Sequence, residues 1–176
     1  LGAAETALGR YGRLNVQFGE LLTLGGVLGE LGETPKPLTP ARRRALVTRL
    51  AYRVMNEINR VTAVTPGALV AAALLTHGKR GISHADLVTA CDRIAAVLRD
   101  QHARFTPSLV SGADPATVRR DALLEACELF VRAGHVEVHR PGVPIGEDDG
   151  RARPGGDSVY VVPDAARLSL DIAKNL

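Results

Sequence analysis

A short run of residues that is apolar on every side constrains the fold more than any other feature of the sequence. It opens at Thr65-Pro66, a capping residue followed by a proline suited to a first helical turn, and continues as Ala68–Leu75. A helix without a polar face is stable only when other elements surround it. The run is also much shorter than the roughly 20 apolar residues that span a bilayer. The sequence therefore predicts a buried central helix in a globular protein.

A longer amphipathic helix is predicted before this central one, beginning at Thr39-Pro40. Its apolar residues recur every three or four positions, which predicts one buried face. They are Leu46, Leu50, Val54, Ile58 and Val61. The first three turns also carry Arg42, Arg43, Arg44, Arg49 and Arg53. A solvated polar face is the simplest interpretation of these arginines, and a surface for anions or a membrane is the alternative.

Three more helices are predicted after the central one. Ser83 with Asp86 three residues later resembles a capping box and opens the first of them. The second begins at Asp114-Pro115 and ends before Gly134, and the last begins at Asp164. The second is followed by two strand-like runs, Val136–Val138 and Ser158–Val162. These runs predict a hairpin with a long connection.

The first forty residues lack helical periodicity. Alternating polar and apolar residues over Arg13–Phe18 predict a half-buried strand. A single strand cannot form a sheet, so we expect its partners to precede Leu1 in a longer protein. The following stretch, rich in glycine and then proline up to Pro40, predicts an irregular linker.

Charge and cysteine content give no sign of nucleic-acid binding, and two cysteines are too few for a disulfide framework or a cysteine metal site. The chain has 176 residues, with 22 Lys and Arg against 19 Asp and Glu, a net charge of +3. This imbalance is too small to indicate nucleic-acid binding by itself. Cys91 and Cys127 lie at apolar positions of predicted helices and are interpreted as core thiols.

No catalytic, metal or cofactor site is predicted. His135 and His139 flank Glu137, but on a strand they would lie about 13 Å apart, too far to share one ion. The remaining histidines, His77, His84 and His102, are interpreted as capping or surface residues. Nucleophile-elbow, P-loop and zinc-protease motifs are absent from the sequence.

The order of helices and hairpin is that of a winged helix, so a DNA-binding module is one functional hypothesis. Its third helix would place Arg119 and Arg120 near the bases. That helix then turns acidic at Asp121, Glu125 and Glu128. Carboxylates facing phosphates are repelled, which argues against this hypothesis.

Four blocks of sequence support a different hypothesis. They are Tyr11–Glu20, Leu50–Leu75, Arg80–Val88 and Arg167–Leu176. In this order they resemble the carboxy-terminal region of the bacterial, membrane-associated glycerol-3-phosphate acyltransferases. The pattern V-T-P-x-A-L-V-x-x-A-L-L is the most specific element. Leu21 departs from the proline that follows Phe-Gly-Glu in the family.

The resemblance implies a non-catalytic part of an enzyme that acts in phospholipid biosynthesis. Residues 1–38 would end an α/β acyltransferase domain, and residues 39–176 would form a mainly helical α+β module behind it. The expected substrates are acyl-CoA or acyl-carrier protein and glycerol 3-phosphate. The family's catalytic His-x-x-x-x-Asp motif would precede Leu1, so this chain alone is expected to be inactive. The whole enzyme is expected at the cytoplasmic side of the cell membrane as a peripheral protein.

Overall fold

A computed structural model describes residues 15–30, 32, 38–111, 117–140 and 154–174. The described residues form two compact units, one up to Thr62 and one from Ala63 onward. This division is not the domain boundary that the sequence predicts between residues 38 and 39. That boundary would separate the end of an α/β domain from the module behind it, and it stays a prediction.

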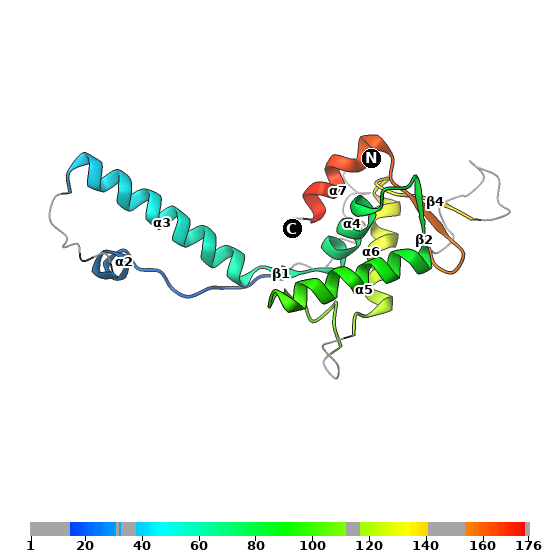
Figure 1. Ribbon diagram of the computed structural model, residues 1–176, viewed down its shortest axis with the longest axis horizontal. Helices are drawn as coiled ribbons and strands as arrows, with labels where there is room; N and C mark the ends of the chain where they lie inside the picture. Colours follow the sequence, from blue (N-terminus) through cyan, green and yellow to red (C-terminus); the bar gives the residue numbers. More distant parts are fainter. Residues whose placement is uncertain (1–14, 31, 33–37, 112–116, 141–153, 175–176) are drawn as a thin grey trace, which may run out of the picture. The chain divides into compact units, whose positions relative to one another are not determined.

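The first unit contains two helices, α2 (Leu24–Glu30) and α3 (Pro40–Val61) (Figure 1). The sequence predicted an irregular linker where α2 lies, and this prediction is wrong. Thr23 opens α2, because its Oγ1 accepts a hydrogen bond from the backbone N–H of Gly26 at 3.1 Å. Such a cap offsets part of the roughly 1 kcal/mol that each glycine costs in a helix relative to alanine. The prolines at 35 and 37 lie outside the described residues.

The segment before α2 has no regular secondary structure over residues 15–23. Arg13 and Leu14, the first residues of the predicted strand, lie outside the described residues. Within the part that is described, Val16 and Phe18 find no partner strand. Phe18 is 90% exposed. The strand prediction is therefore not confirmed within this chain, and the location of its partners stays a prediction.

Helix α3 begins as predicted. Thr39 caps it by accepting a hydrogen bond from the N–H of Arg42 at 3.4 Å, and Pro40 occupies the first turn. The predicted buried face is wrong, because none of the α3 residues is buried. Amphipathic spacing shows that a face is suited to burial, but the described residues provide too few neighbours to cover it.

The second unit surrounds α4 (Pro66–Thr76), the predicted central helix. Thr65 caps it by accepting from the N–H of Ala68 at 3.1 Å. Three helices contact it: α5 (His84–Asp100), α6 (Arg120–Arg132) and α7 (Arg167–Lys174) (Figure 1). A 3₁₀ turn, Asp164–Ala166, precedes α7. The prediction of a buried central helix is confirmed, since six of its residues are buried.

A three-stranded antiparallel sheet lies beside these helices. Its order is β2 (Gly81–Ser83), β5 (Val159–Val161) and β4 (Glu137–His139). The predicted hairpin of β4 and β5 is present, but the sequence missed β2. Gly81 allows β2 to approach β5 closely, because a Cβ at this position would lie 2.8 Å from Cγ1 of Val159. A separate two-residue parallel pair joins β1 (Ala63–Val64) to β3 (Arg104–Phe105).

The order α4, β2, α5, α6, β4, β5 is the arrangement of a winged helix, so the mainly helical α+β class is confirmed. One boundary was wrong. Residues 117–119 are not helical, and α6 begins at Arg120 rather than at Asp114-Pro115, a pair outside the described residues. The backbone before α6 is engaged elsewhere, since the N–H of Arg119 donates to the carbonyl of Leu109 at 2.9 Å. Helix α6 ends as expected, with Gly134 in the left-handed region at φ +71°.

Candidate functional site

The histidines do not assemble a catalytic or metal centre. His135 precedes β4, and Nε2 of His139 lies 3.6 Å from Oε2 of Glu137. No group of three metal-ligating side chains exists among residues 15–30, 32, 38–111, 117–140 and 154–174. His77 contacts the carbonyl of Gly81 through Nε2 at 3.0 Å, and His102 follows the end of α5 with φ at +58°. These contacts are structural.

His84 is the exception among the histidines, because it bonds to a buried tyrosine. Its Nδ1 lies 2.8 Å from the hydroxyl of Tyr160, the central residue of β5. Burial lowers the pKa of His84. A neutral imidazole protonated on Nε2 can accept the tyrosine hydroxyl's hydrogen bond at Nδ1. This pair was not predicted from the sequence, although the strand alternation of Ser158–Val162 could have placed Tyr160 on the inner face.

Cys127, a residue of the hydrophobic core, lies next to the hydroxyl of Tyr160. Burial and then the neighbouring Cys127 raise the pKa of Tyr160. Burial raises the pKa of Cys127 to about 12 and that of Cys91 to about 12 as well. Both thiols belong to the hydrophobic core. They are therefore protonated at neutral pH and unsuited to act as nucleophiles.

The two arginines at the start of α6 have carboxylate partners. Arg120 holds Asp92 of α5 with both terminal nitrogens, Nη1 to Oδ1 at 2.8 Å and Nη2 to Oδ2 at 2.7 Å. Arg119 pairs with Asp121. Later in the helix, Arg132 lies 3.7 Å from Glu128. Phosphates would have to displace these carboxylates, so the geometry does not support the DNA-binding hypothesis.

A further arginine, in the last turn of α5, contacts β3. The guanidinium of Arg99 stacks over the ring of Phe105, 5.2 Å from its centre. In the part of the chain that the structure describes, its Nε and Nη2 are buried without a hydrogen-bond partner. The stacking compensates for part of the lost hydration, because aromatic faces attract cations.

Helix α3 presents an uncovered apolar surface. Five exposed residues at helical spacing, called here the open face of α3, form it: Val47, Ala51, Val54, Met55 and Ile58. The four larger side chains are between 40% and 59% exposed. Residues spaced in this way lie along one side of a helix. The open face is thus a continuous apolar stripe on a helix that carries six arginines.

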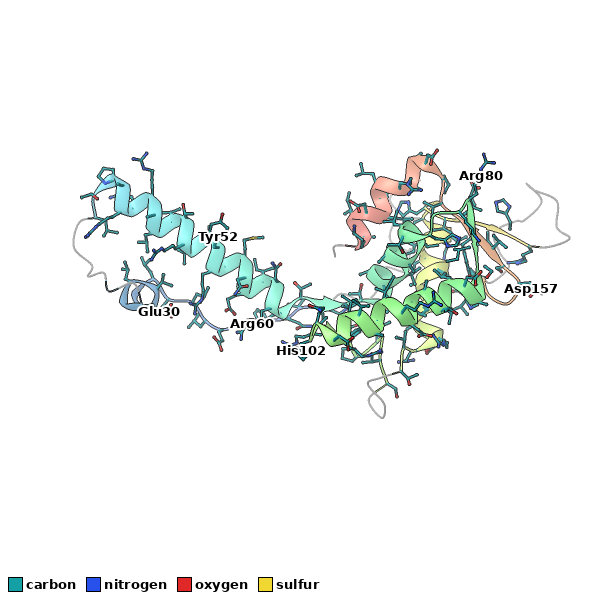
Figure 2. The ribbon with its side chains drawn as sticks, viewed as in Figure 1. Glu30, Tyr52, Arg60, Arg80, His102 and Asp157 are labelled. Atoms are coloured by element: carbon teal, nitrogen blue, oxygen red, sulfur yellow. The ribbon has the colours of Figure 1, made fainter. Side chains whose placement is uncertain are left out.

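The other side of α3 contacts the rest of its own unit. Arg53 bonds to Glu30 of α2 at 2.9 Å, from Nη1 to Oε2. Arg60 lies 3.6 Å from Glu20 and 2.8 Å from Glu57, in each case from Nη2 to Oε2. Figure 2 shows Arg60 on the same side of α3 as Glu30. These ion pairs are exposed and contribute little stability, about 0 to 1 kcal/mol each.

Within the described ranges, no helix combines the length and apolar character needed to cross a bilayer.

Comparison with known proteins gives one consistent result. A family model described as the glycerol-3-phosphate acyltransferase C-terminal region matches residues 1–175. Proteins named glycerol-3-phosphate acyltransferase from Xylella fastidiosa strains M12 and M23 are each 35% identical to this chain over 97 residues. That alignment covers 48% of this chain and 11% of each relative. The corresponding protein of strain Temecula1 matches equally. No solved structure matches.

Proposed function

This chain belongs to the family of glycerol-3-phosphate acyltransferase C-terminal regions. From this premise we propose that it is a non-catalytic part of a glycerol-3-phosphate 1-O-acyltransferase that acts in phospholipid biosynthesis. The observation that carries the proposal is the family match over residues 1–175. The aligned segment covers only 11% of the length of each curated relative. The activity therefore belongs to the intact protein.

The proposed reaction moves a fatty acyl group from acyl-CoA or acyl-carrier protein to glycerol 3-phosphate. A histidine of a His-x-x-x-x-Asp motif takes the proton of the first hydroxyl, whose oxygen attacks the thioester carbonyl. The C–S bond then breaks, and the carrier leaves as a thiol after taking up a proton. We place this motif ahead of residues 11–20 in the intact protein. No residue of the present chain is assigned to catalysis, and the proposal requires no cofactor.

The intact enzyme is further proposed to act at the cytoplasmic side of the cell membrane as a peripheral protein. The arginines in the first turns of α3 support this location. Arg42, Arg43 and Arg44 are exposed there. Basic side chains near a bilayer are attracted to anionic headgroups by about 1 kcal/mol each.

The proposal also divides the chain after residue 38, which is not the boundary between the two compact units. Residues 1–38 end the α/β acyltransferase domain, and residues 39–176 form the module behind it. The winged-helix topology of the second unit does not require nucleic acid as a partner, because one fold carries many functions. The paired arginines of α6 agree with a structural role for this unit.

A thiol-release assay tests the proposal. The intact protein should release free thiol from acyl-CoA or acyl-carrier protein only when glycerol 3-phosphate is present. The 176-residue chain should release none. Replacement of the motif histidine by alanine in the intact protein should abolish release. An intact protein that lacks the motif, or that transfers no acyl group, contradicts the proposal.

A further inference from the structure

We draw no further inference here: the strongest candidate, the open face of α3, is an exposed apolar surface, and nothing in the part of the chain that the structure describes shows what covers it.

Discussion

The hydroxyl of Tyr160 in β5 and Nδ1 of His84 at the start of α5 lie 2.8 Å apart, although 76 residues separate them in the sequence. This contact joins the sheet to the helical layer. Tyr160 is almost completely buried, so its hydroxyl needs a partner inside the protein, and the imidazole provides one.

Loss of this hydroxyl should destabilise the chain modestly. Tyr160→Phe keeps the ring in the core and removes one hydrogen bond, so we expect a cost of about 1 kcal/mol. Urea unfolding measures it. A variant as stable as the parent would show that the bond contributes nothing net, and His84→Phe is the companion variant that removes the other partner.

Stability should fall as the pH is lowered through the range where histidine protonates. The folded state lowers the pKa of His84 below its usual 6.5 because of burial. The unfolded chain therefore binds more protons in this window, and stability rises with pH. The melting temperature should drop as the pH falls below about 6.5. The drop should be shallower in His84→Gln, and an unchanged slope would contradict the assignment to this residue.

Disruption of the central helix should unfold the second unit. Leu74 is buried in α4, so Leu74→Asp places an unpaired carboxylate in the core at a cost of at least about 3 kcal/mol. Leu75 is only partly buried, and Leu75→Asp should cost less. Arg43→Ala on the exposed start of α3 should change stability by less than about 0.5 kcal/mol. Thermal melts of the three variants check this order.

The native thiols should resist modification until the chain unfolds. With a pKa of about 12 for Cys91 and Cys127, roughly one thiol in ten thousand is ionised at pH 8. Iodoacetamide should therefore leave both cysteines unmodified in the folded chain and label both in urea. Rapid labelling of either one in the folded chain would contradict the core assignment.

DNA binding should be weak and unselective. Arg119 and Arg120 are paired with carboxylates, and α6 continues with acidic residues. A fluorescent duplex titrated with the chain should show no sequence preference at physiological salt. Any retention at low salt should disappear as salt rises. Selective binding that persists at physiological salt would restore the winged-helix regulator as a hypothesis.

Local features of the fold could be predicted from the sequence, because they depend on neighbouring residues. Thr39, Thr65 and Ser83 were expected to cap helices. Each accepts a hydrogen bond from the backbone N–H three residues later, at 3.4, 3.1 and 3.1 Å. The core positions of the two cysteines also followed from helical spacing.

Features that depend on distant partners could not be predicted in the same way. Strand β2 has three residues and exists because β5, far along the chain, pairs with it. The contact between His84 and Tyr160 has the same origin. For α3, spacing indicated an apolar face but contained no information about what covers it. Helix α2 was missed because its glycines suggested a linker, whereas the cap at Thr23 acts against that tendency.

The position of β5 in the middle of its sheet has a consequence for synthesis on the ribosome. Its neighbours β2 and β4 both precede it in the chain, and they are not adjacent to each other. Helix α7, which packs against α4, comes later still. While the nascent chain ends before Val161, β2 and β4 have no central strand and α4 has an uncovered side. The winged-helix unit must therefore complete its folding after nearly all of the described chain has left the exit tunnel, and premature termination in its last twenty residues should yield a product for the cell's proteases rather than a shortened module.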